Sequence, residues 1–366
     1  MKKKWILGIC IGMVTVLAFS FVLGLMLWNG STYDPARQAQ TDTAAPFTTE
    51  STSPTTQPAT EPPTEPATEP PTEAATVPPT TAPEPTDAPT EPPTTASPET
   101  TPVQVQPVTP AQYSFVYDCG TGATLYQHGD LDARIYPASI TKLFTARIVL
   151  AHMSQDAELT VGDELDSVAA DASRMYLKKG DTLTVKDLLL GMLLPSGNDA
   201  AYTLAVGTGR VLAEDPSLSA ADAVQVFVDE MNREAQAVGL TATHFAVPDG
   251  YHNDDHYTTP RDVLTLAKLT VENAAIMNIC KIRATTVTTK EGRKLYCKNA
   301  NPLLDQSSEY YCPQAVGLKT GFTKKAGMCL LAVFQENDRY MIIGVFKAAN
   351  RTSRNREVLD LWETYR

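Results

Sequence analysis

Residues 31–110 form a low-complexity segment that limits how much of this 366-residue chain can fold. The segment consists mainly of Thr, Pro, Glu and Ala in loose repeats such as TEPPTEPATEPPTEAA, with almost no aromatic or branched aliphatic residues. Such a composition cannot bury enough apolar surface to offset the entropy of folding. No Lys or Arg occurs between Gln38 and Ala133, so repulsion between acidic groups should keep the segment extended. We therefore expect a disordered stalk.

An apolar run precedes the stalk. Three lysines at positions 2–4 are followed by an uncharged stretch from Trp5 to Trp28, about 24 residues, which is long enough as a helix to cross a bilayer. A cleaved signal peptide would have a shorter apolar core, and this run continues past its only small-residue cleavage candidate at residues 18–20. We expect residues 1–30 to be a single-pass anchor in the cell membrane, with the lysines in the cytoplasm and the rest of the chain outside.

Residues 111–366 remain for the folded part, enough for one domain with a full core. Most of the net charge of −12 comes from the stalk, and no basic patch typical of nucleic-acid binding is present. The extracytoplasmic cysteines are odd in number, and their spacings match no zinc ribbon or C-x-x-C motif. They are Cys119, Cys280, Cys297, Cys312 and Cys329. Both a disulfide between Cys297 and Cys312 and unpaired core cysteines stay open.

The domain begins and ends with strand patterns and is helical between them. A hairpin is expected over residues 113–129, around turn residues such as Gly120. One helix is expected to contain Ser139 and Lys142. Others are expected over residues 184–194, 198–206, 219–240, 259–280 and 356–365. Strands are expected over residues 283–289, 315–321, 328–335 and 339–348. Ser219 and Thr259 should cap their helices, and Gly239 should end the first of these two.

Three short polar motifs interrupt this pattern. They are S-x-x-K at Ser139 and Lys142, S-x-N at Ser196 and Asn198, and K-T-G at Lys319, Thr320 and Gly321. Each has an ordinary structural explanation: a helix cap with an exposed lysine, a capped linker between helices, or an exposed strand edge. Together, in this order and with about 54 and about 121 residues between them, they form a joint signal that chance rarely produces.

The first motif suits nucleophilic catalysis. A serine hydroxyl is a poor nucleophile at neutral pH and needs a base within hydrogen-bond reach. Three positions along a helix bring Lys142 onto the same face as Ser139. A lysine can act as that base only if its pKa is lowered, which burial and a second cation such as Lys319 would both do.

The sequence resembles the serine D-Ala-D-Ala carboxypeptidases, the low-molecular-weight penicillin-binding proteins of the S11 peptidase type. The resemblance covers about 250 residues, through YPASITKLFTA, LLPSGNDAAYTLA, VPDGYHNDDHYTTPRDVLTLA and AVGLKTGFTKKAG. It implies an α+β fold of the β-lactamase and DD-peptidase type, with an antiparallel sheet flanked by helices beside a helical subdomain. It also implies removal of the terminal D-Ala from peptidoglycan pentapeptides through a serine acyl-enzyme, with β-lactams as covalent inhibitors and no cofactor.

The resemblance also implies a role for each site residue. The catalytic residues would be Ser139 as nucleophile, Lys142 as base and Ser196 as proton relay to the leaving amine. The substrate-binding residues would be Asn198 on the peptide backbone, Lys319, Thr320 and Arg354 on the terminal carboxylate, Gly321 leaving room along the strand, and Phe322, whose N–H joins that of Ser139 in the oxyanion hole.

One loop departs from the family pattern. Asp249 stands where relatives are expected to have a histidine or similar residue, and the loop that follows is rich in His and Asp. His252, Asp254, Asp255 and His256 suggest metal ligands, but the Glu of H-E-x-x-H is absent. We expect a polar loop beside the cleft and no metal.

Two alternative functions remain open. A serine β-lactamase shares the fold and the motifs, but no segment of the E-x-x-L-N type lies between Asn198 and Lys319, so deacylation should be slow. A β-lactam sensor or wall-binding module without turnover would need a cytoplasmic signalling part, and only residues 1–4 are expected inside.

Overall fold

The computed structural model describes residues 110–366. The predicted membrane anchor and almost all of the predicted stalk lie outside the described residues, so they stay predictions. No single helix within residues 110–366 is long and apolar enough to cross a bilayer. The helices α6 (Pro260–Glu272) and α7 (Ala274–Cys280) reach that length and composition only as a pair bent by 97°.

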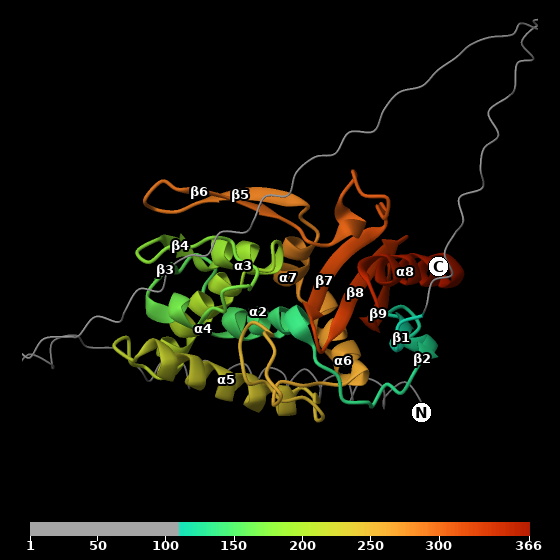
Figure 1. Cartoon of the computed structure of the whole chain (residues 1–366), viewed down its shortest axis with the longest axis horizontal. Coiled ribbons are helices and arrows are strands. Elements are labelled where there is room, and N and C mark those ends of the chain that lie inside the picture. Colours follow the sequence, from blue (N-terminus) through green and yellow to red (C-terminus); the bar gives the residue numbers. More distant parts are fainter. Residues whose placement is uncertain (1–109) are drawn as a thin grey trace, which may run out of the picture. The chain divides into compact units, whose positions relative to one another are not determined.

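A five-stranded antiparallel sheet unites the two ends of the domain, in the order β2-β1-β9-β8-β7 (Figure 1). Its strands are β1 (Tyr113–Asp118), β2 (Ala123–His128), β7 (Ala315–Thr323), β8 (Gly327–Glu336) and β9 (Arg339–Ala348). The predicted hairpin and the three predicted strands that follow residue 314 are confirmed. β8 and β9 are apolar on both faces because both faces of these central strands are covered.

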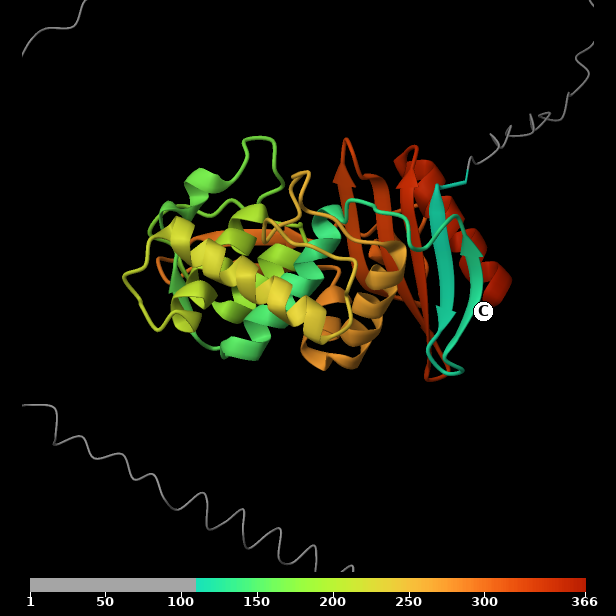
Figure 2. The ribbon, with the colours of Figure 1, turned by 90° about the horizontal axis from the view of Figure 1, so that it is seen from below.

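Helix α8 (Arg351–Tyr365) packs against β8 and β9 on one face of the sheet (Figure 2). Trp362 stacks on Phe334 with the ring centroids 4.5 Å apart. The sequence predicted this helix only from residue 356. It begins earlier because Asn350 caps it, its side chain accepting a hydrogen bond from the N–H of Ser353 at 2.8 Å.

The other face of the sheet carries the helical part, which matches the predicted subdomain. Its helices are α2 (Thr141–His152), α3 (Val185–Leu193), α4 (Asn198–Leu212), α5 (Ala220–Ala237), α6 (Pro260–Glu272) and α7 (Ala274–Cys280), with short 3-10 turns η1 (Ala138–Ile140), η2 (Asp163–Ser167) and η3 (Pro302–Leu304). Two small ribbons pair β3 (Glu158–Thr160) with β4 (Thr182–Thr184), and β5 (Ala284–Thr288) with β6 (Lys294–Lys298). The sequence predicted β5 but none of the other three ribbon strands.

The single helix predicted over residues 259–280 is wrong, because the chain bends sharply at Asn273. Asn273 lies in the extended region and caps α7, its side chain accepting a hydrogen bond from the N–H of Ile276 at 3.1 Å. Asn at this position offers the backbone an alternative to continuing the helix. Ser219, Thr259 and Gly239 take their predicted places at helix ends.

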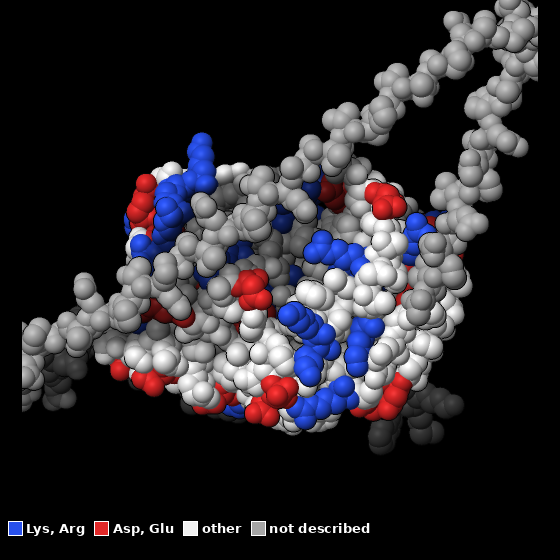
Figure 3. Space-filling view, in the orientation of Figure 1, with Lys and Arg blue, Asp and Glu red and all other residues white. Residues whose placement is uncertain are grey.

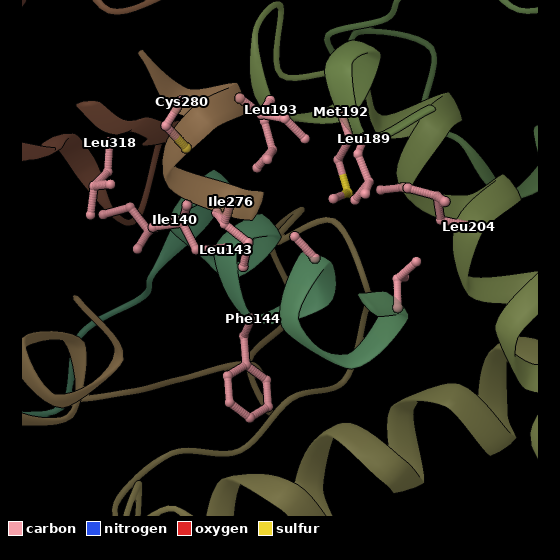
Figure 4. Close-up of a cluster of buried hydrophobic side chains, with 14 of the residues drawn as sticks. Ile140, Leu143, Phe144, Leu189, Met192, Leu193, Leu204, Ile276, Cys280 and Leu318 are labelled. Atoms are coloured by element: carbon pink, nitrogen blue, oxygen red, sulfur yellow. The ribbon is translucent and has the colours of Figure 1, made fainter. Parts of the chain in front are cut away.

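Helix α2 runs through the centre of the core and is buried on nearly all sides along its first two turns. Leu318 of β7, Cys280 of α7 and Leu193 of α3 lie around its start in Figure 4, in one cluster with Ile140 and Leu143. The five cysteines of the described residues are all free, so the Cys297–Cys312 disulfide left open by the sequence does not form. The packing holds η1 between the sheet and the helical part.

Candidate active site

Ser139 lies on η1, which continues directly into α2. Lys142 is in the first turn of α2, and its Nζ donates a hydrogen bond to Ser139 Oγ at 3.0 Å. The residue before the serine, Ala138, adopts a left-handed backbone conformation with a φ of 49°. The sequence placed both residues on one helix; the structure places the serine on a tighter turn at the helix entrance.

Lys142 is fully buried, so the S-x-x-K motif is not a helix cap followed by an exposed lysine. Besides Ser139, its Nζ donates to Asn198 Oδ1 at 2.7 Å and to the Asp249 carbonyl at 2.6 Å, so all three ammonium donors are used. Burial lowers the pKa of Lys142 to about 8, and the negative charges of Asp249 and Asp199 partly oppose this. A lysine of this kind is neutral for part of the time near physiological pH.

Lys319 is the second buried cation. It belongs to the edge strand β7, yet its side chain is 1% exposed and donates to the Thr320 carbonyl at 3.0 Å. Burial, and then repulsion by Lys142, lower the pKa of Lys319 well below its usual value. The exposed-edge explanation of the K-T-G motif is therefore wrong.

Ser196 and Asn198 come from the segment between α3 and α4. Asn198 is the first residue of α4, and its side chain bonds Lys142 instead of capping the helix. Ser196 is 6% exposed and has a φ of 66°. Among residues 110–366 its hydroxyl has no hydrogen-bond partner, although it faces the cleft. A buried hydroxyl left free in this way is available to a ligand.

A cleft of about 980 Å³ lies at this point. Seven of the nine predicted site residues line it, namely Ser139, Ser196, Asn198, Thr320, Gly321, Phe322 and Arg354, while Lys142 and Lys319 lie buried behind them. Gly321 suits the close approach of β7 to the nucleophile turn, because a Cβ there would make a tight contact of 3.2 Å with the Pro137 carbonyl oxygen. This contact places β7, and with it Phe322, beside the Ser139 turn.

The cleft wall beyond Thr320 comes from the start of α8. Arg354 is 5% exposed and donates to Asn355 Oδ1 at 2.9 and 2.7 Å, and burial lowers its pKa to about 10. Basic residues outnumber acidic ones along the cleft: Lys324, Lys325, Arg351 and Arg354 against Asp171 and Glu309. Lys and Arg side chains also gather on the face drawn in Figure 3. An anionic ligand is favoured there.

Several residues of the cleft belong to none of the three sequence motifs. The Tyr251 hydroxyl donates to Asp171 Oδ1 at 2.7 Å and so links two loops that both line the cleft. His252 lines it too, whereas His256 is buried against α2. Within residues 110–366 no cluster of three or more His, Cys, Asp or Glu side chains is placed to hold a metal ion.

Comparison with known proteins identifies the family to which the sequence is similar. The family whose sequence model matches residues 100–350 is described as D-alanyl-D-alanine carboxypeptidase. The D-alanyl-D-alanine carboxypeptidase of Streptomyces sp. (strain K15) is 36% identical over 237 residues, which cover 62% of this chain and 77% of the relative. DacF of Bacillus subtilis is 27% identical over 252 residues (68% and 60%), and DacA of Escherichia coli K12 is 30% identical over 261 residues (69% and 59%). The chain thus spans about three fifths of the length of these last two relatives.

Solved structures agree with the sequence comparison. The crystal structure of the Streptomyces K15 DD-transpeptidase has a TM-score of 0.63 and 33% identity, covering 70% of this chain and 97% of its own. Penicillin-binding protein D2 from Listeria monocytogenes, in its ampicillin-bound form, has a TM-score of 0.55 and 29% identity, covering 69% and 96%.

Proposed function

The chain belongs to the D-alanyl-D-alanine carboxypeptidase family of serine peptidases, and from this premise we propose that it removes the terminal D-Ala from peptidoglycan pentapeptides. Its described domain has the α+β fold of the DD-peptidases. The observation that carries the proposal is the fully buried Lys142, with a pKa of about 8 and its Nζ 3.0 Å from Ser139 Oγ.

The reaction follows from this pair. Neutral Lys142 accepts the hydroxyl proton as Ser139 Oγ attacks the carbonyl between the two D-alanines. The N–H groups of Ser139 and Phe322 stabilise the oxyanion. The C–N bond then breaks, and the proton returns from Lys142 through Ser196 to the leaving amine. Water hydrolyses the acyl-enzyme by the reverse proton path and frees Ser139.

The carboxylate of the leaving D-Ala would lie beside Thr320, with Arg354 and Lys319 supplying positive charge. The unpartnered Ser196 hydroxyl and the excess of basic residues along the cleft support this assignment. Asn198, already bonded to Lys142, would bind the substrate backbone. A β-lactam carries a carboxylate and a strained amide and would acylate Ser139 in the same pose.

We place this domain outside the cell, tied to the membrane by residues 1–30 and extended from it by the stalk. The support is the uncharged run behind three lysines and the Thr, Pro and Glu composition of residues 31–110. This arrangement predicts that a protease added to intact cells reaches the domain but not residues 1–4, and such a proteolysis experiment tests it.

The activity is tested with the full chain in detergent. D-Ala release from a pentapeptide ending in D-Ala-D-Ala is measured beside turnover of a chromogenic β-lactam. Ser139→Ala should abolish both release and covalent labelling, whereas Ser173→Ala, at a cleft serine without a role in the proposed reaction, should retain them. Fast β-lactam turnover without release would indicate a β-lactamase instead. Stable acylation with neither activity would indicate a sensor.

A further inference from the structure

The loop of residues 246–256 is bound tightly to the helix that follows the nucleophile. Lys142 Nζ donates to the Asp249 carbonyl at 2.6 Å, and Thr145 Oγ1 donates to the Pro248 carbonyl at 2.5 Å. A third connection passes through His256, whose Nε2 lies 2.8 Å from Thr141 Oγ1. The loop therefore contacts each of three side chains along the first turns of α2.

The proton position on His256 follows from its partners. Nδ1 accepts hydrogen bonds from the N–H groups of Ala246 at 3.1 Å and Val247 at 3.4 Å, so it carries no proton. The side chain is 1% exposed, and burial, together with the charges of His244, Lys142 and His252, lowers its pKa to about 3. The ring is therefore neutral with its hydrogen on Nε2, which donates to Thr141 Oγ1.

Thr141 passes this interaction on to the nucleophile turn. Its Oγ1 accepts from His256 and donates to the Ala138 carbonyl at 2.8 Å. Gly250 packs against the same carbonyl, so closely that a Cβ on Gly250 would lie 1.9 Å from it. Ala138 has a φ of 49°, a conformation that a residue with a Cβ adopts only when its surroundings hold it there.

The Ala138 carbonyl and the Ser139 N–H belong to one planar peptide group and point in opposite directions. Holding the carbonyl through the Thr141 hydroxyl therefore fixes the direction of the Ser139 N–H, which points away from that hydroxyl. In the proposed reaction this N–H is one of the two donors to the oxyanion, and such donors act only when aimed at the position where the charge develops.

We propose that His256 and Thr141 are positioning residues that hold the peptide group between Ala138 and Ser139, so that its N–H is aimed at the oxyanion. The inference rests on the proposed function, because it needs Ser139 as nucleophile. It gives the neutral His256 a task in catalysis without contact to substrate. It also explains why a histidine of the predicted polar loop is buried against α2.

The test compares two isosteric changes on one helix. Thr141→Val removes the hydroxyl that holds the Ala138 carbonyl. Thr145→Val removes an equally buried hydroxyl that binds the same loop and, at 3.4 Å, the Thr141 carbonyl, but neither Ala138 nor Ser139. Acylation of the full chain by a chromogenic β-lactam is followed by stopped flow. Thr141→Val should lower the acylation rate constant by at least about tenfold, and the dissociation constant of the noncovalent complex should stay within about twofold. Thr145→Val should change neither by more than about threefold, although both variants lose thermal stability.

Variants that keep the hydrogen-bonding groups at positions 141 and 256 should recover the acylation rate constant. Thr141→Ser keeps the hydroxyl and should recover most of it, which provides a readout should Thr141→Val fold poorly. His256→Gln can still accept and donate at similar spacing and should be faster than His256→Ala. The double variant His256→Ala/Thr141→Val should be no slower than the slower single variant, because both break one chain of hydrogen bonds.

Three results would overturn the inference: an unchanged rate in Thr141→Val, an equal loss in Thr145→Val, or losses that multiply in the double variant. If the wild-type chain acylates at Ser139 while one of these holds, only the positioning role fails. A wild-type chain that is never acylated at Ser139 would overturn the proposed function and the positioning role together.

Discussion

Replacing Asp249 by Asn should extend acylation of this protein to lower pH. Asp249 is 1% exposed, and its own carbonyl accepts a hydrogen bond from Lys142 Nζ at 2.6 Å. Burial lowers the pKa of Lys142 to about 8, and the Asp249 carboxylate is the largest influence in the opposite direction. Removing that negative charge leaves the effect of burial less opposed, so the pKa of Lys142 should fall further.

The size of the shift follows from Coulomb's law. An opposite charge within about 4–6 Å shifts a pKa by about one to three units, which at an effective dielectric constant of about 20 corresponds to roughly 3–4 kcal/mol at these separations. Burial also raises the pKa of Asp249, which makes its charge incomplete in acid, so a shift of at least about one unit is expected. The neutral fraction of Lys142 at pH 6 would then rise about tenfold. Above pH 9 the variant should be slower than the wild type, since a weaker base transfers the proton less readily.

The assay is stopped-flow acylation of the full chain by a chromogenic β-lactam between pH 5.5 and 10. The other titratable groups near Lys142, namely Asp199, Lys319 and His256, stay in place. Asp254→Asn is the matched control, because Asp254 belongs to the same loop but is exposed. An acid limb that stays within about 0.3 unit of the wild-type position in a folded Asp249→Asn protein would refute the reasoning, since this is less than a third of the smallest expected shift of about one unit.

Three further changes test other parts of the molecule. Lys142→Ala should keep the fold, checked by circular dichroism, but slow acylation by orders of magnitude; a mild effect would indicate another base. Asp118→Asn should lower the free energy of unfolding in urea by about 1 kcal/mol at pH 7, after solvent screening of the partly exposed Arg339. Arg339 lowers the pKa of Asp118 to about 2, so this stabilisation is present above pH 3.8 and should be lost as the pH falls through 2. Trp362→Ala, which removes the ring stacked on Phe334, should cost about 3–5 kcal/mol in the same assay; a loss below about 1 kcal/mol would mean that α8 is held elsewhere.

Local patterns were enough to predict most of the fold. β9 has the predicted bounds because RYMIIGVFKA is an apolar run limited by turn residues on both sides. Ser219 caps the start of helix α5 with its side chain, and Gly239 follows the end of the helix in a left-handed backbone conformation. The break at Asn273 escaped prediction because an amphipathic pattern continues across it, and only the cap shows that two helices meet there.

The site was harder to predict because its contacts connect distant parts of the chain. Ser139 and Lys142 are near neighbours, and their pairing follows from the period of a helix. Asn198 joins them from 56 residues away, and no local pattern distinguishes this role from a helix cap. His256 reaches Thr141 across 115 residues. Its sequence neighbours predicted only a polar loop beside the cleft, because the residues around a histidine in the sequence do not show which distant element will bury it.

The buried cations explain why the cleft suits carboxylate ligands. Lys142, Lys319 and Arg354 are each at most 5% exposed, and their hydrogen bonds go to neutral hydroxyl, amide and carbonyl oxygens. All three have lowered pKa values, first because of burial, so the surroundings of these side chains disfavour their positive charges. A carboxylate entering beside Thr320 would offset that repulsion at Lys319 and Arg354 and leave Lys142 free to act as the base. A peptide with an amidated terminus offers no such compensation, so we predict from the electrostatics of the folded domain that a peptide with a free carboxylate is preferred.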